Sequence, residues 1–101
     1  MVVAISMDSK QESGLVSNIF GRAKYFALYD TESKELTFMD NPGASQPRGA
    51  GVAAVQAVAD KGAKKVIAGH VGPNAAQALE SNGIEFSPVG DKTLKQVTDT
   101  L

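Results

Sequence analysis

The second half of the chain alternates helix-like and strand-like segments, and this alternation constrains the fold more than any other feature. In order, the segments are a helix with Val52, Val55 and Ala59 on one face, a strand at Lys65–Ala68, a helix at Asn74–Ser81 and a strand at Ile84–Val89. Connections that pass through a helix join parallel strands and are right-handed. This half therefore predicts an α/β fold built on a parallel sheet.

Glycine and proline residues mark the limits of these helices. Lys61-Gly62 and Asn82-Gly83 predict the two helix ends, because glycine readily takes the left-handed conformation that follows a helix. Pro73 fits the first turn of the second helix, where no amide proton is missed. We expect Asp91 to cap a final helix. The apolar face of that helix is made by Leu94, Val97 and Leu101.

The first half of the chain contributes three strand-like runs. They are Val2–Ile5, Tyr25–Asp30 and Glu35–Asp40. The polar segment Thr31–Lys34 between the last two predicts a hairpin, so one strand runs against its neighbours. The sequence thus predicts a five-stranded mixed sheet in the order 3-2-1-4-5, with strand 2 antiparallel. We take residues 1–101 as a single domain.

Three loops are expected to meet at the edge where strands 1, 3, 4 and 5 end. They are Ser6–Phe20, Asn41–Gly51 and Gly69–Pro73, which are the longest loop and the two glycine-rich segments. The direction of connection changes between strands 1 and 4, and ligands of open α/β sheets bind in that crevice. We therefore expect a ligand site at this edge.

Charge and composition argue against several classes of function. The chain has 10 basic and 11 acidic residues, with no basic tract or aromatic stripe that would suit a nucleic acid. It has no cysteine, so disulfides, thiolate zinc sites and cysteine-held iron–sulfur clusters are not expected. No apolar stretch approaches the length of a membrane span. We expect neither a nucleic acid nor a membrane as partner, and a cytoplasmic location.

Two glycine-rich loops lead directly into helices and predict an anion site. Arg48, Gly49 and Gly51 lie at the start of the first helix, and Gly72 and Asn74 lie at the start of the second. Unpaired amides at a helix start favour an anionic ligand, and Arg48 adds a forked, charge-assisted contact. Neither loop has the spacing of a Walker or dinucleotide motif. Turn geometry alone explains each loop equally well, so both interpretations stay open.

His70 is the only histidine, and it follows the predicted strand Lys65–Ala68. Its imidazole can ligate a metal or hydrogen-bond an anion, but a metal site needs further ligands. The alternative, an ordinary hydrogen-bonded loop residue, is the better supported. Met7 and Met39 offer thioethers to copper(I), although methionine more often fills core space. With no carboxylate cluster and no nucleophile elbow, we expect no catalytic residue.

Short motifs follow one another in a fixed order along almost the whole chain. They are Val16-Ser17, Phe20-Gly21-Arg22-Ala23, Tyr25-Phe26, Asn41-Pro42, Gly49-Ala50-Gly51-Val52, Lys61-Gly62-Ala63, Val66-Ile67-Ala68-Gly69, Gly72-Pro73-Asn74-Ala75, Leu79 and Gly83-Ile84. In this order they resemble the dinitrogenase iron–molybdenum cofactor biosynthesis family, which includes NifX-like and NifB C-terminal-like domains. The resemblance implies a three-layer fold of ribonuclease H type. It also implies a protein that binds or carries metal-cluster cofactors and their precursors without catalysis.

Two positions depart from the pattern of that family. Many relatives have a histidine where this chain has Ile19, and another where it has Arg48. The resemblance therefore implies anion binding by Arg22, Arg48 and the loop amides more strongly than ligation by histidine. His70 is the one histidine left as a candidate metal ligand.

We therefore expect a non-catalytic binding or carrier protein for a metal–sulfur cluster of iron, molybdenum or copper, or for a cofactor precursor. The expected site residues are Arg22, Arg48, Gly49, Gly51, His70, Gly72 and Asn74. The alternative is a protein-interaction module that docks on a partner during metallocofactor assembly and ligates no cluster itself. An enzyme is the least favoured function, because the carboxylates that metal-dependent nucleases need are missing.

Overall fold

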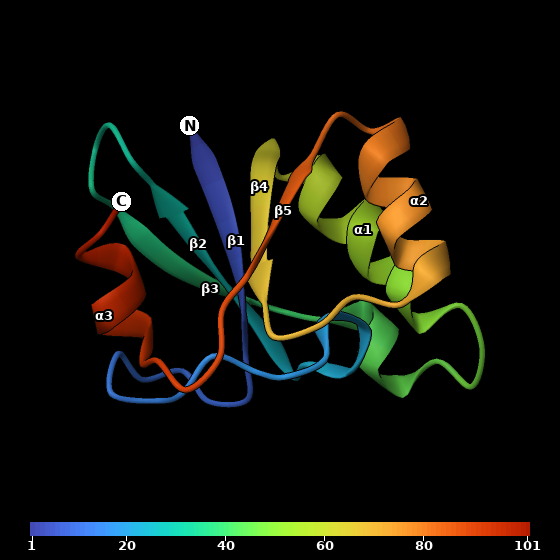
Figure 1. Cartoon of the computed structure of the whole chain (residues 1–101), viewed down its shortest axis with the longest axis horizontal. Helices are drawn as coiled ribbons and strands as arrows, with labels where there is room; N and C mark the ends of the chain where they lie inside the picture. Colours follow the sequence, from blue (N-terminus) through green and yellow to red (C-terminus); the bar gives the residue numbers. More distant parts are fainter.

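The computed structural model describes residues 1–101 as a five-stranded sheet with helices on both faces (Figure 1). The strands are β1 (Val2–Met7), β2 (Tyr25–Asp30), β3 (Leu36–Asp40), β4 (Ala63–Ala68) and β5 (Glu85–Pro88). The helices are α1 (Ala50–Asp60), α2 (Pro73–Ser81) and α3 (Leu94–Thr98), with two short 3₁₀ helices, η1 (Phe20–Arg22) and η2 (Pro42–Ser45). The strand order is β3-β2-β1-β4-β5, as the sequence predicts.

Strand directions also agree with the prediction. β1 pairs antiparallel with β2 and parallel with β4, while β2 and β3 form the antiparallel hairpin and β4 and β5 are parallel. Asp30 holds the hairpin turn, because its carboxylate accepts the amide N–H of Glu32 at 2.9 Å and that of Ser33 at 3.5 Å. The hydrogen bond from Glu32 lowers the pKa of the Asp30 carboxyl.

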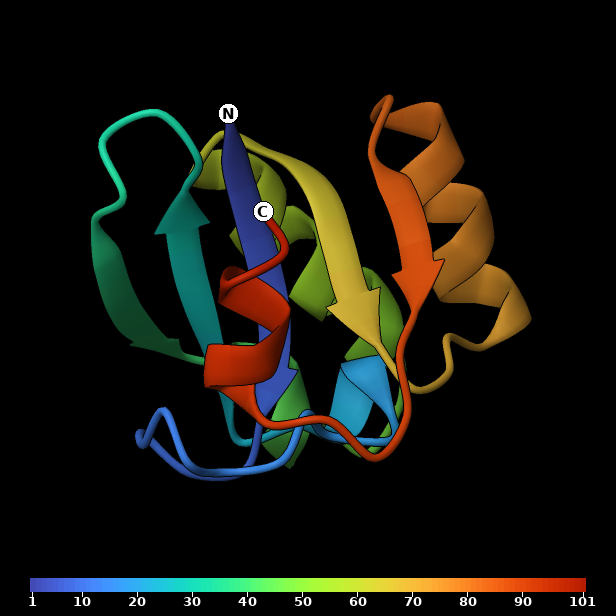
Figure 2. The same ribbon diagram turned by 60° about the vertical axis from the view of Figure 1, so that its left-hand side comes forward.

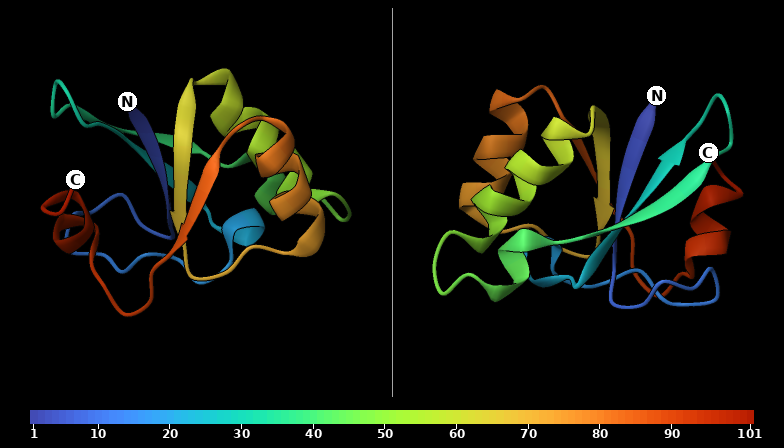
Figure 3. Two further views of the ribbon diagram at one scale, coloured as in Figure 1. Left: turned by 45° about the horizontal axis from the view of Figure 1, so that its top comes forward. Right: turned by 180° about the vertical axis from the view of Figure 1, so that it is seen from behind.

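Helices cover both faces of the sheet, which gives three layers (Figures 2 and 3). Side chains of β1 alternate between the two faces, as they do along any strand. Ala4 belongs to the cluster under α1 and α2, together with Val55. Val3 belongs to the cluster under α3, together with Leu94 and Val97. The three-layer arrangement expected from the resemblance is therefore present.

The predicted helix limits are confirmed at three points. Pro73 is the first residue of α2. Residues 61 and 82 end α1 and α2, and the glycine after each has a positive φ, 81° at Gly62 and 67° at Gly83. These two glycines take the left-handed conformation that turns the chain into the next strand.

Asp91 does not cap the last helix, contrary to the prediction. It has a φ of 57° in the preceding turn, and Thr93 is the N-cap. The Thr93 hydroxyl accepts the Gln96 amide N–H at 3.2 Å, and the Gln96 side chain accepts the Thr93 amide N–H at 2.9 Å. This capping box satisfies two amides at once. Leu101 lies beyond the end of α3, although it still packs on the same apolar cluster.

Two strands are longer than predicted. β1 continues to Met7, because Ser6 and Met7 pair with β2, so the following loop begins at Asp8. β4 begins at Ala63 and pairs there with Val2. None of the helices combines the length and the apolar character that crossing a membrane requires.

Candidate functional site

Three loop segments meet at the lower edge of the sheet in Figure 1, as predicted. The amide of Phe20 donates to the carbonyl of His70 at 3.0 Å, which joins the first loop to the β4–α2 connection. Asn41 is buried, and its side-chain amide donates to the carbonyls of Gly21 at 3.2 Å and Ala23 at 2.8 Å. Backbone and buried side-chain hydrogen bonds therefore hold the three segments as one layer.

Close contacts at glycine bring η1, α1 and α2 together at this edge. A methyl group at Gly21 would lie 2.9 Å from the Cα of Gly51, and one at Gly51 would lie 2.7 Å from the Cβ of Ala75. Both distances are too short for a real side chain. The glycines of the Phe20–Ala23 and Gly49–Val52 motifs are therefore packing residues as well as loop residues.

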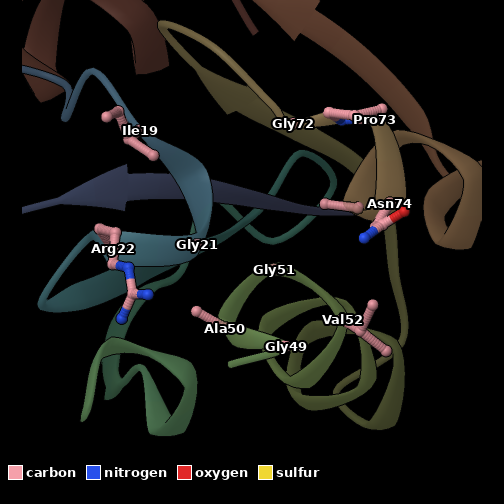
Figure 4. Close-up of a pocket in the computed structure, with 11 residues that line it drawn as sticks. Ile19, Gly21, Arg22, Gly49, Ala50, Gly51, Val52, Gly72, Pro73 and Asn74 are labelled. Carbon is pink, nitrogen blue, oxygen red and sulfur yellow. The ribbon is translucent and has the colours of Figure 1, made fainter. Parts of the chain in front are cut away.

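A cavity of about 270 Å³ opens where these elements converge (Figure 4). Its lining comes from η1 and the first turns of α1 and α2. The lining residues are Ile19, Gly21, Arg22, Gly49, Ala50, Gly51, Val52, Gly72, Pro73, Asn74 and Ala75. This set contains no acidic side chain, and it includes five of the seven residues that the sequence predicts for the site.

The two longer helices begin at this cavity without a side-chain cap. Gly49 and Gly72 are their N-cap residues, and neither has a side chain that could accept a hydrogen bond. Two of the other helices are capped differently. Asn41 caps η2 and Thr93 caps α3, each through its own side chain. Of the three α-helices, only α1 and α2 start without a side-chain cap, and both start at the cavity; the short η1 on the cavity wall also has no side-chain cap.

Five backbone amides at these helix starts have no acceptor within the chain. They belong to Ala50, Gly51, Val52, Asn74 and Ala75. Amide protons at a helix start point away from the helix, and the helix dipole adds partial positive charge there. Two such starts on one cavity give it a surface whose charge suits an anion.

Arg22 lies on the cavity wall, but part of its guanidinium group is already engaged. Nη1 donates to the carbonyl of Gln46 at 2.7 Å and to that of Ala44 at 3.4 Å. In Figure 4 the guanidinium group points toward η2 rather than toward the start of α2. Its Nε and Nη2 atoms have no partner in the chain. Arg22 therefore joins the cavity to the loop that precedes α1.

Arg48 and His70 do not line the cavity, although both were predicted as site residues. Arg48 is exposed, directly precedes Gly49 and takes part in no hydrogen bond or ion pair of its side chain. His70 is also exposed, and its role in the structure is the carbonyl contact with Phe20. No group of three or more histidine, aspartate or glutamate side chains is placed to hold a metal ion.

Sequence reasoning missed the apolar rim of the cavity. Ile19 and Val52 are 50% and 48% exposed, and they are two of the few large apolar side chains on the surface. Val52 was expected on the buried face of α1. It is exposed because it shares a helix face with the exposed residues Gln56 and Asp60, four and eight positions later. One signal in the sequence could have placed Val52 at the site: it directly follows the glycine-rich motif Gly49-Ala50-Gly51.

The comparisons with known proteins agree with this fold. The family model described as dinitrogenase iron-molybdenum cofactor matches residues 1–101. No curated protein matches the sequence. The apo form of the orange protein from Desulfovibrio gigas has a TM-score of 0.92 at 32% identity, covering 97% of this chain and 83% of that one.

Two further solved structures are similar. A Thermotoga protein described as a candidate NifB protein has a TM-score of 0.85 at 34% identity, covering 98% of this chain and 84% of that one. A candidate dinitrogenase from Methanocaldococcus jannaschii has a TM-score of 0.70 at 17% identity, covering 97% of this chain and 84% of that one, and shows the fold alone. Because the family model spans all 101 residues, the chain belongs to the dinitrogenase iron-molybdenum cofactor family.

Proposed function

We propose that the chain is a non-catalytic carrier that holds a metal–sulfur cluster, or an anionic precursor of a metallocofactor, in the cavity at the loop edge. The cargo contains iron, molybdenum or copper. The family is one of cofactor assembly, which supports a role without catalysis. The orange protein was solved in its apo form, which implies a ligand for that relative. The proposal includes a ribonuclease H-like classification, a single domain over residues 1–101 and a cytoplasmic location.

The observation that carries the proposal is the convergence of two uncapped helix starts on one cavity. Five unpaired amides and two helix dipoles act there, and no acidic side chain lines the wall. A sulfide-rich cluster bears net negative charge, and groups of backbone amides hold such anions in proteins. The lining offers amides and an arginine rather than thiolates. Its chemistry therefore suits a cargo bound through its anionic surface.

Arg48 and His70 have secondary roles in this proposal. The Arg48 side chain has no partner and directly precedes the cavity residue Gly49, so it is free to turn toward a bound anion. His70 lies two residues before Gly72 in the connection to α2. From there it can hydrogen-bond the cargo, or ligate a metal at its surface, without forming a site alone.

The variant Asn74→Asp tests the proposal directly. Asn74 is exposed on the cavity wall in the first turn of α2, so an aspartate of the same shape suits the helix dipole while it repels an anion. We expect the apo protein to keep its stability and its affinity for tetrathiomolybdate to fall about tenfold or more. Equilibrium dialysis with molybdenum analysis measures that affinity. The matched control is Gln77→Glu, which makes the same change of charge on the same helix outside the cavity.

Three results would count against the carrier. They are no binding of tetrathiomolybdate by the wild type, equal loss in both variants, and no loss in Asn74→Asp. The cargo itself is identified by metal and sulfide analysis of protein purified anaerobically from its own host. The Arg48→Ala, His70→Ala double variant serves as its comparison. Metal that the wild type retains and the double variant loses would support the secondary roles of Arg48 and His70.

A protein-interaction module is the alternative function. The observation that favours it is the exposed pair Ile19 and Val52 on the cavity rim. Apolar side chains at an exposed rim are typical of a surface that a partner covers. The double variant Ile19→Ser, Val52→Ser separates the two functions. Loss of a protein partner with unchanged binding of tetrathiomolybdate favours the module, and the reverse result favours the carrier.

A further inference from the structure

Arg22 occupies an unusual position between the cavity and the loop before α1. It lies on the cavity wall, while its Nη1 holds two carbonyls of the segment 43–48, which is otherwise exposed for most of its length. The contact with Gln46 is short, at 2.7 Å, and the contact with Ala44 is longer, at 3.4 Å. Hydrogen bonds with a charged donor are among the stronger ones in proteins.

We propose that Arg22 is a positioning residue that couples occupancy of the cavity to the conformation of segment 43–48. It acts on the cargo mainly through this loop rather than as a simple positive charge. This inference rests on the proposed function, because it assigns how the same cavity is regulated.

The geometry of the guanidinium group explains the coupling. The group is planar and carries five N–H donors in a fixed fork. Nη1 donates to both loop carbonyls, which leaves the protons of Nε and Nη2 without a partner on a residue that lines the cavity. An anion that accepts hydrogen bonds from Nε and Nη2 favours the same side-chain conformation that holds the loop. Ligand and loop therefore stabilise each other through one side chain.

Segment 43–48 also sets where α1 begins. Its end toward Asn41 is fixed, because the Asn41 side chain accepts the Gly43 amide N–H at 2.9 Å. Its other end leads through Arg48 to the N-cap Gly49. Arg22 is the only side chain that holds the middle of this segment by hydrogen bonds. Without it, we expect the loop to open and Arg48, which precedes the cavity residue Gly49, to become more accessible.

Trypsin cleavage after Arg48 reports the order of this loop. The bond between Arg48 and Gly49 is exposed, and mass spectrometry identifies the fragments 1–48 and 49–101. We expect this cut to be about tenfold faster in Arg22→Gln and in Arg22→Lys, because both side chains end short of the Nη1 position that reaches the two carbonyls. Lys24→Gln is the matched control, since it removes a neighbouring exposed charge outside the cavity. Its rate should equal that of the wild type.

The same assay with saturating tetrathiomolybdate tests the coupling. We expect the anion to slow the cut in the wild type and in Lys24→Gln, and to leave it unchanged in the two Arg22 variants. Equal apo rates in all four proteins would overturn the positioning role. Wild-type behaviour of Arg22→Lys would also overturn it, because a simple charge would then suffice.

A failure of the carrier function gives a different pattern. If the wild type binds no tetrathiomolybdate, the proposed function and the coupling both fall. Faster apo cleavage in the Arg22 variants would then identify a loop anchor alone.

Discussion

At Gly51, a hydrogen in place of a methyl group lets α1 approach α2. A Cβ there would lie 2.7 Å from the Cβ of Ala75. Alanine normally favours a helix over glycine, but here the added methyl group overpacks the contact. We expect Gly51→Ala to lower the free energy of unfolding by about 2 kcal/mol, measured by urea denaturation.

A second substitution tests the cause of that loss. Ala75→Gly removes the methyl group that would clash, so the double variant Gly51→Ala, Ala75→Gly should recover stability relative to Gly51→Ala alone. Such recovery between residues in contact is a coupling that independent sites do not show. If Gly51→Ala is as stable as the wild type, the contact between α1 and α2 is looser than the structure shows.

At the scale of elements, α2 begins without a side-chain cap, which leaves its first amides free for the anion that we propose the cavity holds. Gly72 is its N-cap in an extended conformation, with φ −69°, and a Cβ there meets nothing within 4 Å. Serine fits such a position, and its hydroxyl accepts an amide N–H of the first turn. We expect Gly72→Ser to be stable, or stabilised by a few tenths of a kcal/mol, and to bind tetrathiomolybdate more weakly, since the hydroxyl occupies a donor. Thermal unfolding and equilibrium dialysis measure the two effects.

The control for this variant is Gly90→Ser, at another glycine with open space around it but outside the cavity. It should leave the affinity unchanged. Unchanged affinity in Gly72→Ser as well would mean that the amides of α2 do not contact the anion.

The sequence predicts the elements well because their limits depend on local chemistry. Gly62 and Gly83 follow the ends of α1 and α2, and Pro73 begins α2, as their local backbone preferences predict. The handedness of the connections then fixes the strand order. Asp91 was wrongly assigned because Thr93, two residues later, makes the reciprocal bond with Gln96. When two capping residues lie close together, the side chain with the better partner decides the cap.

The candidate site was only partly predictable, because its parts come from separate segments. The glycine-rich starts of α1 and α2 are visible in the sequence, and both line the cavity. The bonds from Arg22 to the carbonyls of Ala44 and Gln46 join residues more than 20 positions apart, and no local pattern marks them. The exposure of Val52 depends on which face of α1 packs on the sheet, and in an alanine-rich helix the apolar pattern alone does not identify that face.

At the scale of the whole molecule, the net charge is −1, yet the loop edge gathers unpaired amides, two helix starts and two arginines. Binding to the folded state alone raises stability by mass action, by about 2.7 kcal/mol when the ligand is at 100 times its Kd. For a chain of this length we expect saturating tetrathiomolybdate to raise the Tm by about 10 °C or more, measured by scanning calorimetry.

The variant Arg48→Gln measures how much of the rise in Tm caused by tetrathiomolybdate comes from the positive charge of Arg48. The Arg48 side chain makes no contact that holds the fold, so the apo Tm should stay the same while the increment from the anion falls. About 0.5 M salt should reduce the increment in the wild type more than in Arg48→Gln, because salt screens the exposed arginine more than the amides of the cavity. Lys64→Gln, on an exposed residue of β4 outside the cavity, is the matched control and should behave as the wild type. An increment equal in all three proteins would leave the amides as the source of the affinity and exclude Arg48 from the site.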